Sequence, residues 1–200
     1  MLQCNCSLLG DEVSGEGMVI DPGDNIDQIL ALLARHGLRL KMIVITHAHI
    51  DHIGGAAKLR KATGAPVYMH GDDKMLSDRL DLQAAWLGVE TPEDPGIDTA
   101  AREGDVLRLG ATDLQVLHTP GHTRGSLCLF LPGEQKLIAG DTLFRGSVGR
   151  TDLPGGDTAA LLQSIRAKLL VLPEETVVIP GHGRETTIGR EKRENPFVGG

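Results

Sequence analysis

The stretch Thr46-His47-Ala48-His49-Ile50-Asp51-His52 places three imidazoles and one carboxylate within seven consecutive residues. It overlaps the end of Lys41-Met42-Ile43-Val44-Ile45-Thr46, a nearly continuous apolar run that predicts a strand buried on both faces. In an extended segment, residues i and i+2 point to the same side, so His47 and His49 can bind one metal ion together. The stretch therefore predicts a metal site at the end of a buried strand.

Histidine and aspartate also follow later predicted strands, next to glycine, at Gly121-His122, Gly140-Asp141 and Gly181-His182. An α/β fold builds a site in this way, by delivering side chains from several strands to one edge of a sheet. Asp51 and His52 lie where the chain turns into a helix predicted near Gly54-Gly55, so they would face a slightly different point from His47 and His49. Asp141 and His182 are available to complete a second site there.

The candidate ligands are imidazoles and carboxylates, without a thiolate, which suits Zn²⁺, Fe²⁺ or Mn²⁺. Seven are too many for one four-coordinate ion and fit a pair of ions that share a bridging carboxylate. They are His47, His49, Asp51, His52, His122, Asp141 and His182. A single histidine after a strand is more commonly a hydrogen-bonded structural residue, and we interpret His70 and His118 in this way. His36 is expected at a helix C-terminus, where it favours the helix dipole.

Short apolar runs alternate with segments of helical periodicity, which predicts an α/β fold in two halves. Strands are predicted at 17–20, 41–46, 66–69, 105–109, 113–118, 126–131, 136–139 and 176–179. Helices are predicted from the N-cap Asn25 to the stop signal Gly37, over about 55–63 and over about 158–170. Residues 71–103 are interpreted as an irregular, substrate-side insertion with one helical stretch. The tail from Arg184 is interpreted as polar and solvated, and we expect one domain over 1–200.

The 200-residue chain is 40% hydrophobic, and its formal charge of −7 argues against general binding to nucleic acid or to anionic membranes. We see no apolar run near the ~18 residues that a membrane span needs and no signal peptide at the N-terminus. The odd number of cysteines, Cys4, Cys6 and Cys128, favours a reducing compartment. We therefore expect a cytoplasmic protein, with its three cysteines as inert core residues.

The joint pattern resembles the metallo-β-lactamase superfamily. The matching motifs are Thr46–His52, Gly121–Ser126, Gly140–Phe144 and Pro180–Gly183, which occur in the order typical of the family. The resemblance implies an αββα sandwich with a metal site at one edge of its two sheets. It also implies that His47, His49 and His122 bind a first metal ion. Asp51, His52 and His182 would bind a second, and Asp141 would bridge the two ions, for which Zn²⁺ is expected first.

Within the superfamily, the segment from Gly140 through Arg150 to Asp157 most resembles the glyoxalase II group. That resemblance implies hydrolysis of a thioester, such as an S-hydroxyacylglutathione, by a metal-bound hydroxide that Asp51 orients as the catalytic residue. A thiolate leaves without a dedicated general acid, because free thiols ionise near ~8.5. Two interpretations of Arg150 and Asp152 are open: they shape the site or bind an acidic substrate, or they form a structural ion pair with each other or with Asp157.

Two alternatives stay open at this point. The related persulfide dioxygenases carry a similar G-R-T-D segment and use a single iron, for which His47, His122 and Asp141 would be the ligands. A non-catalytic, metal-stabilised binding protein is the second alternative. The longer glyoxalase II enzymes hold glutathione through basic residues of a C-terminal helical domain. Here Arg190, Lys192 and Arg193 could substitute for them or simply be solvated, and the oligomeric state is not predicted.

Overall fold

The computed structural model describes residues 2–199 and divides into two compact units. The N-terminal unit extends to Ala101 and includes Arg108–Thr112, and the C-terminal unit contains Arg102–Leu107 and the chain from Asp113 onward. No helix within residues 2–199 is both long enough and apolar enough to span a membrane. The single domain over 1–200 stays a prediction.

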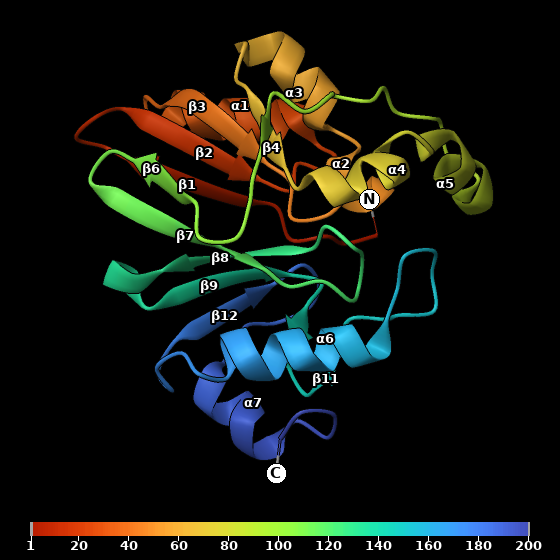
Figure 1. The fold of residues 1–200 in the computed structure, drawn as a ribbon. Coiled ribbons are helices and arrows are strands. Elements are labelled where there is room, and N and C mark those ends of the chain that lie inside the picture. The colour runs from red at the N-terminus through yellow and green to blue at the C-terminus, as the bar shows by residue number, and fades with distance from the viewer. Residues whose placement is uncertain (1, 200) are drawn as a thin grey trace. The chain divides into compact units, whose positions relative to one another are not determined.

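The N-terminal unit is built on a five-stranded sheet of order β1-β2-β3-β4-β5 (Figure 1). Its first pair is antiparallel, and the pairs β2–β3, β3–β4 and β4–β5 are parallel. The strands are β1 (Ser7–Asp11), β2 (Glu16–Ile20), β3 (Arg39–Val44), β4 (Val67–Met69) and β5 (Thr99–Ala100). The helical elements are α1 (Ile26–Arg35), α2 (Ile50–Ile53), α3 (Ala56–Thr63), η1 (Gly71–Asp73), α4 (Lys74–Ser77) and α5 (Leu80–Leu87).

Helix α1 shows why this unit folds as its sequence predicts. Ile29 and Leu33, one turn apart on α1, are buried in one apolar cluster with Val19 of β2 and Ile43 of β3. Asn25 occupies the predicted N-cap, although its side chain makes no capping hydrogen bond there. Gly37 follows the C-cap with a φ of 63°, a left-handed conformation that glycine adopts without steric cost.

The C-terminal unit contains most of a six-stranded sheet of order β13-β12-β9-β8-β7-β6, of which only residues 108–112 of β6, β7 and their turn belong to the N-terminal unit, and a short β10–β11 hairpin. Its strands are β6 (Val106–Leu109), β7 (Thr112–His118), β8 (Leu127–Leu131), β9 (Lys136–Gly140), β10 (Leu143–Phe144), β11 (Ser147–Val148), β12 (Val177–Pro180) and β13 (Thr186–Thr187). Its helices are α6 (Thr158–Ser164), which continues as a π-helical segment (Ile165–Leu169), and α7 (Ile188–Glu194). Strands β9 and β12 pair in parallel, and α6 lies between them in sequence.

A second apolar cluster holds the C-terminal unit together. Leu161, Ile165 and Leu169 lie in it with Leu137 and Val178 from neighbouring strands. The periodicity that predicted a helix over 158–170 is thus the pattern of residues that this cluster buries. The predicted helix is confirmed, and its last five residues, Ile165–Leu169, are wound as a π-helix.

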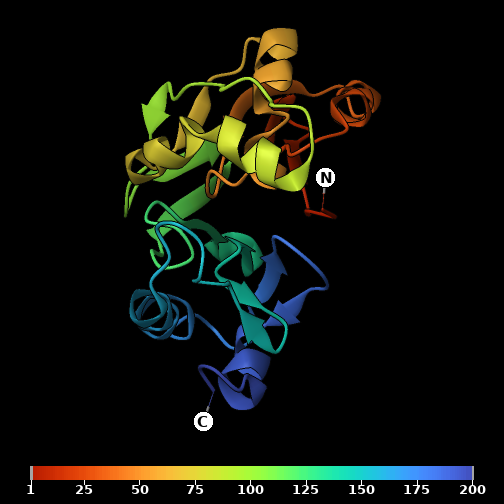
Figure 2. The same ribbon diagram turned by 90° about the vertical axis from the view of Figure 1, so that its right-hand side faces the viewer.

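Two predictions need correction. Strand β3 ends at Val44 rather than at residue 46, so His47 and His49 lie in an irregular loop between β3 and α2. The tail from Arg184 is not simply solvated, because it forms β13 and α7. Within the C-terminal unit, α7 contacts the β10–β11 hairpin (Figure 2): Gly146 donates its backbone N–H to Glu191, and Asn195 donates its side-chain amide to the carbonyl of Ser147.

Candidate metal centre

Three imidazoles gather at the carboxyl end of β3 in the N-terminal unit. The ring centroids of His47 and His49 lie 4.8 Å apart in an edge-to-face arrangement, and those of His47 and His52 lie 4.0 Å apart. His47 and His52 are fully buried, and His49 is partly buried. The predicted pairing of His47 with His49 is therefore present, although an irregular loop rather than a strand places it.

Asp51 and His52 share the short helix α2. The Nε2 atom of His52 lies 3.8 Å from the Oδ2 atom of Asp51, and both residues are buried. That separation is too long for a hydrogen bond and suits two groups that coordinate a common cation. The helical turn supplies these neighbours, as expected from a chain that leaves the loop and enters a helix.

Asp21 belongs to this site, although the sequence pattern predicted only a turn there. It accepts hydrogen bonds from Nδ1 of His52 at 2.9 Å, from Oγ1 of Thr46 at 2.6 Å and from the backbone N–H of Thr46 at 2.7 Å. The Oγ1 atom of Thr46 also lies 3.1 Å from Nδ1 of His47. Because the Thr46 hydroxyl donates its proton to Asp21, it accepts from His47. Asp21 thus orients one imidazole directly and a second through Thr46.

The loop Asp21-Pro22-Gly23 reads in sequence as an ordinary turn after β2, which is why Asp21 was overlooked. Two features mark it in the structure. Asp21 has a φ of 53°, a left-handed conformation that is uncommon outside glycine. A Cβ atom at Gly23 would lie 1.7 Å from the carbonyl oxygen of Asp51, so only glycine allows this approach. The sequence feature that could have revealed Asp21 is its place as an acidic residue at the end of β2, the strand next to β3, which leads to the histidines.

In the C-terminal unit, Asp141 lies between two histidines. Its Oδ2 atom is 3.6 Å from Nε2 of His122 and 3.7 Å from Nε2 of His182. The three residues follow β7, β9 and β12, as predicted. A carboxylate held between two Nε2 atoms beyond hydrogen-bond distance has the position that a bridging ligand needs.

His122 is oriented by the main chain. Its Nδ1 atom lies 2.7 Å from the carbonyl oxygen of Arg150, which can only accept, so Nδ1 carries the proton. The neighbouring residue Gly149 packs tightly here: a Cβ atom would lie 1.9 Å from the carbonyl oxygen of Asp141 and 3.2 Å from Cβ of His122. The segment after the β10–β11 hairpin therefore supports two predicted ligands at once.

The side chain of Arg150 forms a bidentate ion pair with Asp152. The Nε–Oδ1 distance is 2.8 Å, and the Nη2–Oδ2 distance is 2.7 Å. The hydrogen bonds from Arg150 lower the pKa of Asp152 to about 2. Both side chains are more than half exposed to solvent. Of the two interpretations of Arg150, the ion pair is the one that the structure contains.

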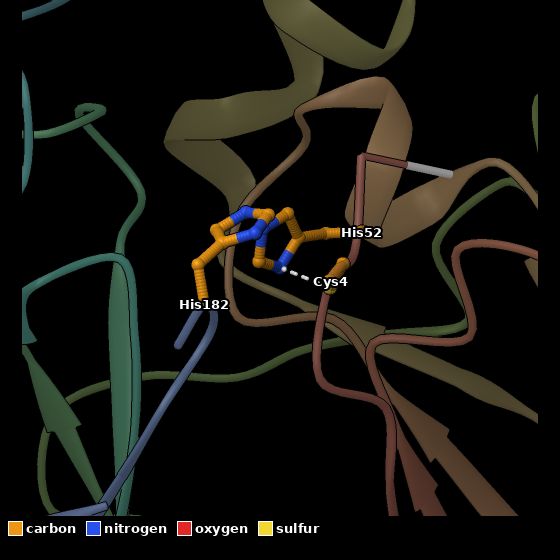
Figure 3. Close-up of side chains that lie close together, drawn as sticks. All are labelled: Cys4, His52 and His182. Carbon is orange, nitrogen blue, oxygen red and sulfur yellow. Dashed lines mark hydrogen bonds between the residues drawn. The ribbon is translucent and has the colours of Figure 1, made fainter. Parts of the chain in front are cut away.

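The cysteines differ from their prediction as inert core residues. Only Cys128 is fully buried, and burial raises the pKa of its thiol to about 11. Cys6 is exposed. Cys4 is partly buried, and its Sγ atom lies 3.5 Å from Nδ1 of His52, the contact marked in Figure 3. Burial also raises the pKa of Cys4, because leaving water disfavours a thiolate.

Histidines interpreted as structural have local partners. Nε2 of His118 lies 2.8 Å from the carbonyl oxygen of Arg124. The Nδ1 atom of His70 accepts from the backbone N–H of Asp72. His36 is the C-cap of α1. His36 thus lies at the helix C-terminus, as predicted, and the structural interpretation of His70 and His118 stays a prediction.

The basic residues of α7 are engaged in ion pairs. Arg190 pairs with Glu194, and both Lys192 and Arg193 pair with Glu174, at N–O distances of 3.1–3.7 Å. Arg190, Lys192 and Arg193, which could have replaced the basic residues of a glutathione-binding domain, therefore each have an acidic partner within the protein.

The donor set fits a divalent metal. Nδ1 of His52 faces the carboxylate of Asp21, and Nδ1 of His122 faces the carbonyl oxygen of Arg150, and both oxygens can only accept. Nδ1 of His47 faces the hydroxyl of Thr46, which accepts because it donates its own proton to Asp21. In the neutral form of each ring, the lone pair therefore lies on Nε2. Metal-binding histidines typically hold their second nitrogen in this way. An α/β fold with imidazole and carboxylate donors of this kind at its strand ends defines a divalent-metal enzyme rather than a thiolate-bound structural site.

Residues 1–182 match the model of the Metallo-beta-lactamase superfamily. The chain therefore belongs to the metallo-β-lactamase superfamily. It is 39% identical over 98% of its length to hydroxyacylglutathione hydrolase GloC of Haemophilus influenzae, 93% of which the match covers. The family and this relative support a metal-dependent hydrolase as the enzyme class.

Solved structures confirm the predicted α/β fold of metallo-β-lactamase type. The BLEG-1 B3 metallo-beta-lactamase matches 100% of this chain and 96% of its own, with a TM-score of 0.91 and 37% identity. TTHA1623, solved in a di-iron-bound form, matches 98% and 96% with a TM-score of 0.88 and 43% identity. ETHE1 from Myxococcus xanthus matches 98% and 80% with a TM-score of 0.83 and 32% identity.

Proposed function

We propose that the chain is a binuclear metal-dependent hydrolase of a thioester such as an S-hydroxyacylglutathione. The observation that carries the proposal is the hydrogen bond at Nδ1 of three histidines, which leaves Nε2 of His47, His52 and His122 as the candidate ligand atom. The thioester is supported by the 39% identity to a protein named hydroxyacylglutathione hydrolase.

We assign two divalent ions to the seven predicted ligands. By the sequence motifs, His47, His49 and His122 would bind the first ion. Asp51, His52 and His182 would bind the second, and Asp141 would bridge them. The position of Asp141 between Nε2 of His122 and Nε2 of His182 supports the bridging role. Zn²⁺ is proposed first, with Fe²⁺ or Mn²⁺ as alternatives. Of these two alternatives, Fe²⁺ has the support of the di-iron-bound form of TTHA1623.

Bound divalent ions lower the pKa of water and polarise a carbonyl, which are the two requirements of thioester hydrolysis. We assign Asp51 to orient the attacking water, because its carboxylate is buried and can accept a hydrogen bond from it. Asp21 would keep His52 in its productive orientation during turnover. A thiol leaving group ionises near ~8.5, so no residue need act as a general acid.

The main alternative is an iron-dependent persulfide dioxygenase with His47, His122 and Asp141 as ligands. It is favoured by the 32% identity to ETHE1, since this chain shares the G-R-T-D segment of that group at Gly149–Asp152. Arg150, bound to Asp152 in the structure, would in either case reach an acidic substrate only after the ion pair opens.

The remaining proposals concern partners. We propose a small-molecule substrate in the cytoplasm and no binding to nucleic acid or membrane, in keeping with the formal charge of −7.

Metal analysis combined with substrate assays tests the function. The protein would be purified without added metal and assayed with S-lactoylglutathione, with a glutathione persulfide under oxygen, and with a chromogenic β-lactam. We expect two ions per chain and release of free thiol from the thioester. One iron per chain with oxygen uptake on the persulfide would overturn the proposal, and so would hydrolysis of the β-lactam alone.

The variant Asp51→Ala separates an enzyme from a non-catalytic binding protein. We expect it to remain folded and to lose at least ~100-fold in kcat, the scale of a lost acid–base contribution. Asp24→Ala, at an exposed position after β2, is the matched control. A protein that only binds metal would show no thioester turnover in any of these forms.

A further inference from the structure

The loop between β3 and α2 is held from outside by side chains. Residues 45–49 lie outside any helix or strand, so their backbone groups need partners from elsewhere. Thr46, His47 and Ala48 of the loop are buried, as is Ile50 at the start of α2, and His49 is partly buried. Asp21 binds the backbone N–H of Thr46. The next two contacts come from the insertion at 71–103.

Asp73 supplies the first of these contacts. It lies at the end of η1 and is fully buried, and its Oδ2 atom accepts a hydrogen bond of 2.9 Å from the backbone N–H of Ala48. Ala48 is the residue between His47 and His49. A carboxylate in a buried position is costly unless hydrogen bonds satisfy it, so its presence here indicates a specific role.

Gln83 supplies the second contact from α5. Its Oε1 atom accepts from the backbone N–H of Ile50 at 2.9 Å, and its Nε2 atom donates to the carbonyl of Ala48 at 3.1 Å. The same Nε2 atom donates to the carbonyl of Leu76 at 3.1 Å, at the end of α4. One amide thus bridges the two peptide groups that flank His49 and ties them to α4.

We propose that Asp73 and Gln83 are positioning residues that hold the backbone of the His47–His49 loop in its metal-binding conformation. The inference rests on the proposed metal centre but assigns a role that the ligands themselves do not have. It gives the insertion at 71–103 a function: η1, α4 and α5 brace the ligand loop from within the N-terminal unit, where sequence analysis had expected a substrate-side loop.

The physical reason is preorganisation. Two imidazoles bind one ion tightly only if both are held close to the required geometry before the ion arrives. A loop without ladder hydrogen bonds would otherwise sample many conformations and lose that geometry. Hydrogen bonds from buried side chains to Ala48 and Ile50 restrict the φ and ψ angles on both sides of His49. Loss of such supporting contacts typically lowers metal affinity 10–100-fold.

The test compares metal affinity in Gln83→Met and Gln83→Glu with that in Leu80→Ala. Met has nearly the length of Gln and removes all three hydrogen bonds, whereas Glu keeps the acceptor for Ile50. Leu80 is a buried core residue of the same helix, and its apolar side chain makes no hydrogen bond to the loop, so its truncation reports the effect of lost core packing. Affinity for Co²⁺ would be measured by competition with a chelator, together with the visible absorption spectrum of bound Co²⁺ and the melting temperature.

We expect Gln83→Met to weaken Co²⁺ binding about 10-fold or more and to change the spectrum, and Gln83→Glu to lose less. Leu80→Ala should lower the melting temperature and leave the affinity within about twofold. Equal losses of affinity in Gln83→Met and Leu80→Ala would overturn the proposal, because the effect would then follow stability. An unchanged affinity in Gln83→Met would overturn it as well.

Asp73 offers a second, independent pair of variants. Asp73→Asn keeps an oxygen that can accept from Ala48, and Asp73→Leu does not. We expect the Asn variant to retain most of the Co²⁺ affinity that the Leu variant loses, and equal affinities of the two would contradict the role. The wild-type protein tests the proposed function separately. If wild type did not bind Co²⁺, the proposed metal centre itself would be wrong, whatever the variants show.

Discussion

The imidazole of His52 donates its Nδ1 proton to the carboxylate of Asp21 across 2.9 Å, and the two side chains are 0% and 2% exposed. A hydrogen bond to a buried carboxylate is about twice as strong as one between neutral groups. It fixes both the rotation of the ring and the nitrogen that carries the proton. The candidate ligand atom, Nε2, is therefore oriented before any metal binds.

Replacement of Asp21 should damage folding and metal binding together. Asp21→Ala leaves three buried donors without their acceptor, each worth about 1–3 kcal/mol, so we expect a loss of at least ~3 kcal/mol in the free energy of unfolding. Metal affinity should fall by about 10–100-fold. Urea unfolding and chelator competition measure the two effects. Asp24→Ala, exposed in the same loop, serves as the control. Equal metal affinity in both variants would contradict the role of Asp21.

The sequence was sufficient to place the candidate ligands at strand ends, and it was insufficient for the side chains that support them. His122, Asp141 and His182 could be predicted because strand ends and glycines mark them locally. Asp21, Asp73 and Gln83 could not, because their contacts with the ligand loop depend on how β2, η1 and α5 pack, over sequence separations of 25–35 residues. Residues 184–194 were missed for a related reason.

That missed segment buries a polar network, which no hydrophobic periodicity reveals. Glu191 of α7 is fully buried and accepts hydrogen bonds from Oγ1 of Thr186, the backbone of Gly146 and the side chain of Asn195. The helix is thus stabilised by satisfied polar groups in addition to Ile188 in the apolar cluster.

Glu191→Ala should accordingly destabilise the protein. Loss of a buried, hydrogen-bonded carboxylate leaves its three donors unsatisfied, and we expect a cost of about 3 kcal/mol or more in the free energy of unfolding. Glu194→Ala, on the exposed side of the same helix, should change stability by less than ~1 kcal/mol despite its ion pair with Arg190. Similar unfolding midpoints for the two variants would show that the tail is merely solvated.

The close approach of Gly149 to Asp141 makes it sensitive to a single methyl group. Gly149→Ala would place Cβ 1.9 Å from the carbonyl oxygen of Asp141, and the backbone must shift to relieve the contact. Overpacking of this kind costs typically about 1–3 kcal/mol. Because the shift occurs beside Asp141 and His122, we also expect reduced metal occupancy, measured by elemental analysis after dialysis. Gly133→Ala, where a Cβ meets nothing within 4 Å, is the control.

Arg150 allows the role of its side chain, which binds Asp152, to be tested apart from the role of its backbone carbonyl, which binds His122. The pKa of Asp152 is about 2 because Arg150 donates to it, so Arg150→Gln should raise that pKa toward the ordinary 3.8. The pair favours the folded state above about pH 4, and this contribution is lost as the pH falls through 2. NMR titration of the Asp152 carboxyl carbon measures the change. Metal occupancy should not change, since His122 binds the carbonyl of residue 150; loss of metal would contradict this separation.

Chelation should remove activity without unfolding either unit. Each unit has its own apolar cluster, around Ile43 and Leu59 in the first and Leu161 and Val178 in the second, and neither cluster includes a predicted ligand. Ions that bind the folded state alone stabilise it, so we expect their removal to lower the melting temperature and to leave the far-ultraviolet circular dichroism spectrum at 25 °C unchanged. Thioester hydrolysis should disappear on dialysis against a chelator and return on addition of Zn²⁺ or Fe²⁺. Collapse of the dichroism signal on chelation would show instead that the metal holds the fold together.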